Sequence, residues 1–251
     1  MLDYDREAER YDATRGGDAR ADAAAAAIET LLEAPLPFRV VDVGCGTGIV
    51  TVRLVRPGRS VTGIERSAGM AAVAAGRLPG RIALGDASRL PVASGSADVV
   101  TMVWLLHLLS HTDSAAALAE AGRVLRPGGL LITTVGKDGA SYGEADDAAA
   151  VLAPVRAAFE HEPADGLDRV LDIGRRAGLE LAGQTTFVGV GQGLSPGQWR
   201  RRLRHGDIEW VLAAGAERLD GLYAAIEELP DQDRARPDPV YRLVALRLAG
   251  R

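Results

Sequence analysis

The chain has 251 residues, of which 47% are apolar and 25% charged, with a formal net charge of −5 at pH 7 and a pI near 5.5. Such a length and apolar content suit one large domain with a buried core and argue against disorder. The acidic balance disfavours a DNA- or RNA-binding face, and the one basic cluster, Arg200 to Arg204, is interpreted as the solvated face of a helix.

The single cysteine, Cys45, excludes a disulfide framework and favours an intracellular protein. The acidic N-terminus MLDYDREAER is unlike a signal peptide, and the apolar runs are shorter than the roughly 18 to 20 residues that span a membrane. We therefore expect a cytoplasmic protein without membrane contact. The few histidines form no clustered ligand motif, so no metal is expected.

Helical and strand-like segments alternate along the first half of the chain. An alanine-rich helix is predicted over residues 18–33, with Asp18 as its candidate cap, and it stops before Pro35. The next segments are FRVVDV, a helix from about Ile49, SVTGIE, SAGMAAVAAGR, RIALGD, ADVVTMVW, SAAALAEAGRVL and GLLITTV. This alternation predicts right-handed crossovers and a parallel sheet with helices on both faces.

The pattern loosens after Gly136 and then resumes with the helix LDRVLDIGRRAG and the strand LELAGQTTFVGVG. Two helical stretches lead to a final strand, VYRLVALRL, which suits an antiparallel insertion near the sheet edge. We expect a single domain over residues 1–251. Its candidate lid elements, around the crevice where such sheets bind ligands, are residues 1–33, 136–164 and 192–235.

Three glycines follow the first strand in the stretch VVDVGCGTGIVT, residues 40–51. They spell G-x-G-x-G, whereas a dinucleotide fingerprint places its third glycine at the position of Ile49. A phosphate-binding P-loop is excluded because no Gly-Lys-Ser/Thr follows. The loop therefore favours a nucleoside-like ligand without a pyrophosphate, approached closely by the backbone.

Acidic residues end the next two strands. Glu65 closes SVTGIE, where a carboxylate can accept hydrogen bonds from both hydroxyls of a ribose. Asp86 closes RIALGD, where it can accept from an adenine amino group, with the amide of Ala87 near a ring nitrogen. Loop, ribose acid and adenine acid thus follow in the order that an adenosyl ligand needs.

The segments VVDVGCGTG, GIERSAGM, GDASRLP, ADVVTMVWLLHLL and LRPGGLLITT together resemble the class I S-adenosylmethionine-dependent methyltransferases, in the small-molecule group that includes the ubiquinone and menaquinone C-methyltransferases. These motifs cover residues 38–135, and YDATR at residues 11–15 resembles the family's Y-D-x-x-R. The resemblance implies an α/β, Rossmann-like, seven-stranded sheet of order 3-2-1-4-5-7-6 with strand 7 antiparallel. It also implies S-adenosylmethionine as cofactor and S-adenosylhomocysteine as product.

The same resemblance gives residues of this chain their roles. The cofactor-binding set is Arg15, Gly44, Cys45, Gly46, Glu65, Arg66, Met70, Asp86, Ala87 and Val103. The candidate substrate contacts are Tyr11, Trp104 and Trp199, although packing of amphipathic helices also explains Trp199. His107 is the candidate general base, with a structural histidine as the alternative. Asp42 is expected to orient the loop amides.

We expect methyl transfer to a small molecule, with oxygen as the commonest acceptor and nitrogen or carbon left open. The high alanine, arginine and glycine content suggests a high-GC bacterial source, in which a secondary metabolite, as in antibiotic biosynthesis, is a reasonable substrate. A macromolecular substrate is disfavoured, because TMVW stands where an Asn/Asp-Pro-Pro-aromatic motif would be. A second alternative stays open, namely a non-methylating member that binds the cofactor structurally and catalyses a cyclisation or binds a ligand. A monomer or homodimer is expected.

Overall fold

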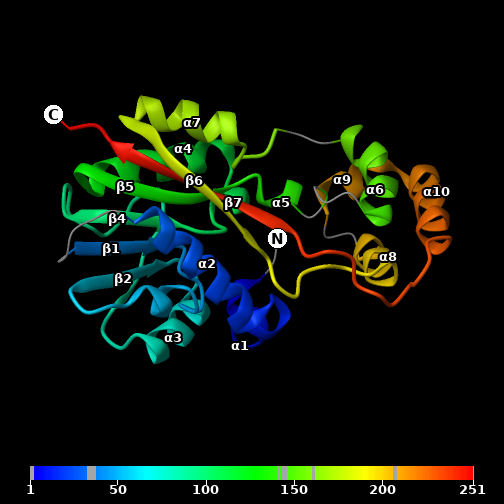
Figure 1. The fold of residues 1–251 in the computed structure, drawn as a ribbon, viewed down its shortest axis with the longest axis horizontal. Coiled ribbons are helices and arrows are strands. Elements are labelled where there is room, and N and C mark those ends of the chain that lie inside the picture. The colour runs from blue at the N-terminus through cyan, green and yellow to red at the C-terminus, as the bar shows by residue number, and fades with distance from the viewer. Residues whose placement is uncertain are drawn as a thin grey trace.

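Seven strands form one mixed sheet in the order β3-β2-β1-β4-β5-β7-β6 (Figure 1). The structure is a computed structural model that describes residues 3–32, 38–140, 142, 146–159, 162–205 and 208–250. The strands are β1 (Phe38–Val43), β2 (Arg59–Glu65), β3 (Ile82–Leu84), β4 (Ala97–Met102), β5 (Leu125–Val135), β6 (Leu179–Val188) and β7 (Val240–Leu248). Only β7 runs antiparallel to its neighbours, β5 and β6. The predicted fold class and strand order are confirmed.

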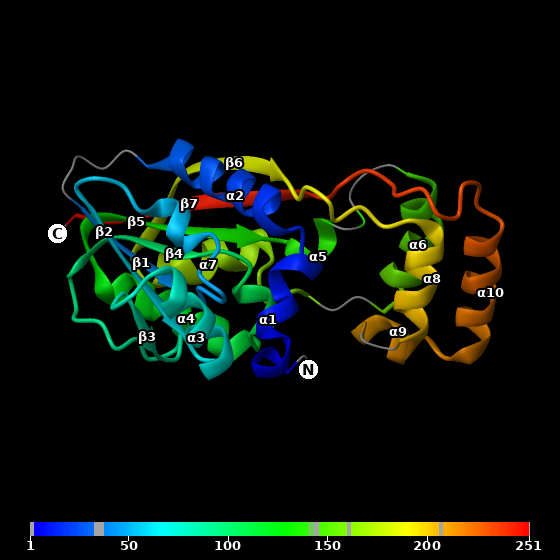
Figure 2. The ribbon, with the colours of Figure 1, turned by 90° about the horizontal axis from the view of Figure 1, so that it is seen from below.

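Helices cover both faces of this sheet. They are α1 (Tyr4–Thr14), α2 (Gly17–Leu31), η1 (Thr51–Leu54), α3 (Ala68–Arg77), η2 (Leu106–Leu108), α4 (His111–Val124), α5 (Lys137–Ala140), α6 (Asp147–Ala157), α7 (Leu167–Arg176), α8 (Pro196–Arg204), α9 (Glu209–Ala214) and α10 (Ala216–Glu227). Figure 2 shows α2 on one face and α4 on the other. The first strands and the site at their carboxyl ends are therefore held between two helical layers.

Successive residues of the central strands pack on opposite helical layers. In β1, Val40 lies in the apolar cluster that contains Ile28 of α2, whereas Val41 lies in the cluster that contains Leu118 of α4. A parallel strand covered on both faces needs apolar residues at nearly every position, and FRVVDV supplies them. The packed strands hold their carboxyl ends in fixed positions at one edge of the sheet.

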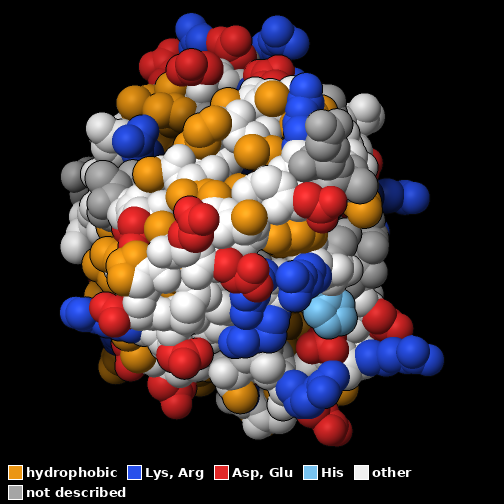
Figure 3. Space-filling model, turned by 90° about the vertical axis from the view of Figure 1, so that its right-hand side faces the viewer, with side chains coloured by type: hydrophobic (Ala, Val, Ile, Leu, Met, Phe, Trp, Pro, Cys, Tyr) orange, Lys and Arg blue, Asp and Glu red, His pale blue; other side chains and the backbone are white. Residues whose placement is uncertain are grey.

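Beyond that edge, α6, α8, α9 and α10 pack together into what we call the helical cluster (Figures 1 and 2). Its core includes Leu152, Trp199, Trp210 and Ile226. Figure 3 views the molecule from this end, where Lys and Arg side chains are interspersed with Asp and Glu. This face therefore carries side chains of both charges.

The helical cluster belongs to two of the predicted lid segments, 136–164 and 192–235. Residues 141, 143–145, 160, 161, 206 and 207 of these segments, and residues 1, 2 and 33 of the N-terminal one, lie outside the described residues. A lid function for the three segments stays a prediction.

Two local predictions were wrong. The segment after β1 forms a single 3₁₀ turn, η1, because the β-branched run IVTV disfavours an α-helix and Pro57 soon follows. Asp18 does not cap α2, whose N-cap is Gly16; instead Asp18 accepts a hydrogen bond from Nη2 of Arg53 at 2.6 Å. No described helix is long and apolar enough to cross a membrane.

Candidate functional site

One cavity of about 1360 Å³ lies at the carboxyl ends of the first strands. Its walls come from the loops after β1, β2, β3 and β4, from α1 and α2, and from α5, α8 and β7. We call the part formed by the loops after β1, β2 and β3 the acidic half, because Asp42, Glu65 and Asp86 line it. The part lined by Arg15, Arg20, Trp104, His107 and Arg202 is the basic half.

The glycine loop lines the cavity with main chain that carries few side chains. Gly44 and Gly46 have φ values of 69° and 56°, in the region that L side chains rarely adopt. A Cβ on Gly46 would meet no protein atom within 4 Å, so it would occupy open space at a residue that lines the cavity. The loop thus leaves room for a ligand to approach the main chain closely.

Cys45 fits a packing role in this loop. A Cβ on Gly63 of β2 would lie only 2.7 Å from the Cys45 Sγ, so the two chains approach as closely as small residues allow. Burial, with the negative charges of Asp42 and Glu65, raises the pKa of the Cys45 thiol. The thiol is therefore protonated and unreactive at neutral pH.

Glu65 is held at the end of β2 by three backbone amides. Its Oε2 accepts from the Gly46 amide at 2.9 Å, and its Oε1 accepts from the amides of Arg66 and Ser67, both at 2.8 Å. A carboxylate has about four acceptor positions, so about one remains free. Acceptance from two ribose hydroxyls would require one of the three amide bonds to be released.

Asp86 and its neighbours line the cavity at the end of β3. The Asp86 Oδ1 accepts from the amide and hydroxyl of Ser88 at 2.8 and 2.6 Å, and these bonds hold the pKa of Asp86 below its usual value. Ala87 and the exposed Arg66 also line the cavity. Met70, 2% exposed, lies in the first turn of α3 beside them. The predicted adenine residues therefore share one wall.

Asp42 does not orient the loop amides. Its two carboxylate oxygens accept from the hydroxyls of Thr51 and Thr101, at 2.5 and 2.7 Å, while the amides of Gly44 and Cys45 donate to the carbonyl of Ile64. Burial raises the pKa of Asp42 to about 6, against the effect of the two hydroxyl bonds. Asp42 thus ties the 3₁₀ turn η1 to β4 beneath the loop.

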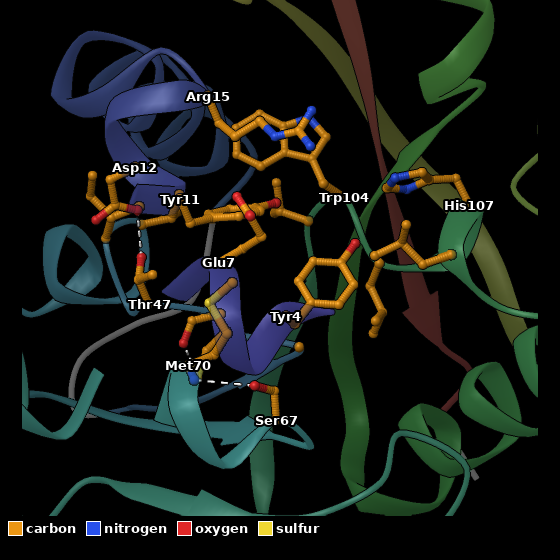
Figure 4. A pocket seen from close by; sticks show the side chains of 18 of the residues that line it. Tyr4, Glu7, Tyr11, Asp12, Arg15, Thr47, Ser67, Met70, Trp104 and His107 are labelled. Atoms are coloured by element: carbon orange, nitrogen blue, oxygen red, sulfur yellow. Dashed lines mark hydrogen bonds between the residues drawn. The ribbon is translucent and has the colours of Figure 1, made fainter. Parts of the chain in front are cut away.

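Helix α1 closes over the acidic half and is fastened at both ends; Figure 4 shows the bond near its end, between Asp12 and Thr47. Near its start, the Asp5 Oδ1 accepts from the Ser67 hydroxyl and the Gly69 amide, at 2.6 and 2.8 Å. Near its end, the carboxylate of Asp12 accepts from the Thr47 hydroxyl and from Arg77, both at 2.6 Å. The N-terminal segment is therefore bonded directly to the glycine loop and to α3.

Trp104 marks the change from the acidic to the basic half. It follows β4 with φ of 54°, a rare value for a residue other than glycine, and its amide donates to the Thr134 hydroxyl at 2.8 Å. Its ring meets those of Phe187 and Tyr241 edge-on, each at 5.7 Å between centroids. The preceding Val103, 8% exposed, also lines the cavity.

His107 lies in η2 and faces the same space as Trp104 and Tyr4 (Figure 4). Its buried Nδ1 has no hydrogen-bond partner among the described residues. Burial, reinforced by the positive charge of Lys137, lowers its pKa to about 3. The ring is therefore neutral at pH 7, which allows it to accept a proton, although with low affinity.

The remaining predicted contacts separate into two groups. Tyr11 and Arg15 line the cavity, with the Arg15 guanidinium 5.8 Å from the Tyr11 ring centroid. Trp199 is absent from the cavity wall: it is 4% exposed, packed within the helical cluster at 5.3 Å from the Tyr142 ring. A substrate contact by Trp199 stays a prediction. Gln198 and Arg202 of α8 do line the cavity, and the Arg202 guanidinium carbon lies 5.6 Å from the centroid of the Trp199 ring.

Tyr4 and Arg20 are two of the cavity residues that escaped the sequence reasoning. Tyr4 stands seven positions before Tyr11, a spacing that puts both rings on one face of α1, 6.1 Å apart. Arg20 precedes Ala24 and Ile28 at four-residue intervals, so it heads the buried stripe of α2 and is 6% exposed. Helical periodicity was the signal that could have found both.

The chain matches known proteins over its first strands. Residues 41–133 match the profile of the methyltransferase domain family. An uncharacterized methyltransferase of Geobacillus kaustophilus is 33% identical over 134 residues, which are 52% of this chain and 60% of that protein. A demethylmenaquinone methyltransferase of Mycolicibacterium vanbaalenii is 40% identical over 94 residues, or 38% of this chain and 40% of that protein. The chain thus spans about half the length of these relatives.

Two solved structures share the fold along most of the chain. The geranyl diphosphate C-methyltransferase of Streptomyces coelicolor has a TM-score of 0.53 at 18% identity, covering 92% of this chain and 79% of that one. The cyclase SpnF also has a TM-score of 0.53, at 23% identity, covering 93% and 81%. At these identities the similarity concerns the fold.

The sheet order, the glycine loop and the strand-end acids define the class I S-adenosylmethionine-dependent methyltransferase fold. The chain has this fold, and its residues 41–133 match the methyltransferase domain family. The cofactor of the class is S-adenosylmethionine, and its product is S-adenosylhomocysteine.

Proposed function

We propose that this protein transfers a methyl group from S-adenosylmethionine to a small molecule. The observation that carries the proposal is the single cavity that joins the glycine loop, Glu65 and Asp86 to Trp104 and His107. Bound S-adenosylmethionine supplies a sulfonium-linked methyl group that is already strongly electrophilic. The protein therefore has to align the acceptor and exclude water, and no metal is needed.

The residues present fit this cofactor. Gly44, Cys45 and Gly46 would hold its methionine part, and the open space at Gly46 accommodates it. Glu65 would hold the ribose, while Met70, Asp86 and Ala87, with Arg66 nearby, would hold the adenine. Arg15 would pair with the cofactor carboxylate, because a guanidinium matches its geometry. Val103 would face the methyl group from the end of β4.

On the basic half, Trp104 and Tyr11 would contact the acceptor, and His107 would accept a hydrogen bond or proton from its nucleophilic group. We propose an oxygen nucleophile, with nitrogen or carbon as alternatives, on a bacterial secondary metabolite. Residues 1–33 and the helical cluster with its connections would form the lid over both ligands. The protein would act in the cytoplasm as a monomer or homodimer, without nucleic acid.

The test is a mass-spectrometric screen of candidate metabolites for the gain of one methyl group, with S-adenosylhomocysteine measured in the same reaction. We expect both products to form in equal amounts. The second candidate is a cofactor-binding protein that catalyses a cyclisation, as the fold of SpnF permits. In that case the acceptor would be converted equally well with S-adenosylhomocysteine in place of the methyl donor, and methyl transfer would be excluded.

A further inference from the structure

Three guanidinium groups of the basic half have no carboxylate partner among the described residues. They belong to Arg15 at the end of α1, Arg20 in α2 and Arg202 in α8. Lys137, in contrast, is paired with Asp138, whose Oδ1 lies 2.9 Å from its Nζ. The basic half therefore carries positive charge that the protein itself leaves uncompensated.

Arg20 is the most constrained of the three. Only 6% of the residue is exposed, and its guanidinium carbon lies 3.5 Å from the centroid of the Trp104 ring. Its Nη1 donates to the carbonyl of Arg15 at 2.8 Å, whereas its buried Nε has no hydrogen-bond partner in the described part of the chain. The stacked indole of Trp104 holds the guanidinium at the cavity wall, where its Nε–H is left without an acceptor.

Such burial is costly for a charged group. Burial lowers the pKa of Arg20, but a guanidinium remains protonated at neutral pH. Buried charges in proteins are ordinarily paired, because desolvation without a partner costs several kcal/mol. An unpaired guanidinium that lines a cavity thus indicates a missing anion.

The positive groups act on the same region of the cavity. Burial raises the pKa of Tyr241 in β7, and the charges of Arg20, Arg202 and Arg15 all oppose that rise. Tyr241 also lines the cavity. Groups from α1, α2 and α8 therefore act on the same side chain, where the charge of Asp138 opposes them.

The charges of the cofactor account for only one of the three arginines of the basic half. S-adenosylmethionine contributes a sulfonium and an ammonium against a single carboxylate, and the proposed function pairs that carboxylate with Arg15. The acidic half can balance the remaining positive charge of the cofactor, but Arg20 and Arg202 then remain without an anion. An acceptor without negative charge would leave this imbalance in place.

We propose that the methyl acceptor carries an oxyanion, a carboxylate or a phosphate ester, which Arg20 and Arg202 bind. The planar guanidinium suits both groups because it can donate two parallel hydrogen bonds to them. Stacking on Trp104 fixes the Arg20 group beside the residue that the proposed function places against the acceptor. This inference rests on the proposed function and names the substrate class of the same site.

The test uses two probes, inorganic pyrophosphate for the phosphate class and phthalate for the carboxylate class. Each is titrated calorimetrically into the full-length protein saturated with S-adenosylhomocysteine. We expect one probe to bind saturably, and which one it is distinguishes the two classes. Arg20→Gln and Arg202→Gln should each raise its dissociation constant by about tenfold or more, the range of one lost charge-assisted hydrogen bond.

The matched control is Arg201→Gln. Arg201 precedes Arg202 in α8; both are exposed, but only Arg202 lines the cavity, so this variant makes the same charge change on the same helix. We expect probe affinity to stay within about twofold, as for an exposed surface substitution. Because Arg20 is buried, Arg20→Gln can prevent folding, and Arg20→Lys then replaces it as the test variant. Lysine keeps the positive charge but cannot donate two parallel hydrogen bonds, so the probe should bind more weakly than to wild type.

The experiment distinguishes failure of the oxyanion site from failure of the proposed methyl-transfer function. If wild type loaded with S-adenosylhomocysteine bound neither probe, the oxyanion site would be wrong. The same holds if Arg20→Gln weakened S-adenosylhomocysteine about tenfold and left the probe unaffected, since Arg20 would then belong to the cofactor. If wild type bound no S-adenosylhomocysteine, the proposed function would fail. A probe that still bound, and was lost in Arg202→Gln, would support the anion site alone.

Discussion

The two halves of the cavity treat their polar side chains in opposite ways. In the acidic half, Glu65 accepts three backbone hydrogen bonds and Asp86 accepts two from Ser88. In the basic half, the buried Nε of Arg20, Nε1 of Trp104 and Nδ1 of His107 have no hydrogen-bond partner among the described residues. In the acidic half the protein supplies most of the hydrogen bonds of Glu65, whereas the basic half leaves buried donors and acceptors open.

This difference indicates which half of the cavity needs a ligand to satisfy its buried polar groups. The carboxylates of the acidic half stand on packed strand ends, so this half should hold the adenosyl part of the cofactor after the release of one Glu65 amide bond, with Arg15 as the one contribution from the basic half. Buried polar groups without partners are costly, and a ligand that pairs with them recovers that cost. The basic half should therefore govern which acceptor is bound.

The largest effect should come from Glu65→Ala, which removes the anchor of the acidic half. We expect the dissociation constant for S-adenosylhomocysteine to rise by about 100-fold, because charge-assisted hydrogen bonds contribute about 1.5 to 3 kcal/mol each. Isothermal titration calorimetry measures it. Glu180→Ala, on the exposed side of β6, is the control and should bind as wild type does. An affinity within about threefold of wild type for Glu65→Ala would remove Glu65 from the cofactor site.

The next effect concerns the buried charge beneath the acidic half. The pKa of Asp42 is raised to about 6, so the stability that its neutral form contributes is fully present below the unfolded value and is lost as pH rises through about 6. Asp42→Asn keeps the shape without the charge. Above that pH we expect the variant to be more stable than wild type by about 2 kcal/mol, less than the shift allows because an amide cannot accept from both hydroxyls.

Urea unfolding at pH 5 and pH 8 tests this prediction through the difference between variant and wild type, which cancels the groups that both share. The gain in stability should be larger at the higher pH. An equal difference at both values would mean that Asp42 carries no raised pKa. S-adenosylhomocysteine affinity should change little, because Asp42 bonds to Thr51 and Thr101 rather than to the loop amides.

The sequence predicted the structure well where a single physical requirement, such as burial of a strand on both faces, determines the residue type. Buried parallel strands require continuous apolar runs, so β1 and its neighbours could be located, and strand ends fix Glu65 and Asp86 at one edge of the sheet. The helix expected from Ile49 failed, because four β-branched residues override the preference for a helix after a strand. A glycine loop alone does not determine whether an α-helix or a 3₁₀ turn comes after it.

The basic half was less accessible to sequence reasoning because its residues come from distant segments. Arg20, Trp104 and Arg202 are brought together only by the tertiary fold, and no spacing motif links them. From residue type, Trp199 was the candidate for a substrate contact and Arg202 for a solvated helix face. In the structure the Trp199 ring packs inside the helical cluster, while Arg202 lines the cavity. Helix faces in a four-helix arrangement depend on which neighbour each helix meets.

A smaller effect should follow from His107→Ala, which tests the basic half. With a pKa of about 3, the imidazole is neutral over the whole pH range of assay, so it acts by hydrogen bonding and as a weak base. We expect kcat to fall by about tenfold, as for one lost hydrogen bond, with pH–rate profiles of parallel shape above about pH 5. An inflection between about pH 6 and 7 that disappears in the variant would indicate a base of ordinary pKa instead.

The smallest effect should come from Asp12→Asn, which loosens α1 over the acidic half without changing the lining of the basic half. The carboxylate of Asp12 bonds Thr47 of the glycine loop and Arg77 of α3, and an amide can replace only one acceptor of the pair. We expect S-adenosylhomocysteine to bind about fivefold more weakly, as for the partial loss of a charged hydrogen bond, with kcat nearly unchanged. Glu9→Gln, exposed on the same helix, makes an equal charge change and should have no effect. A fall in kcat alone would show that α1 acts on the acceptor, and the two halves would then not be independent.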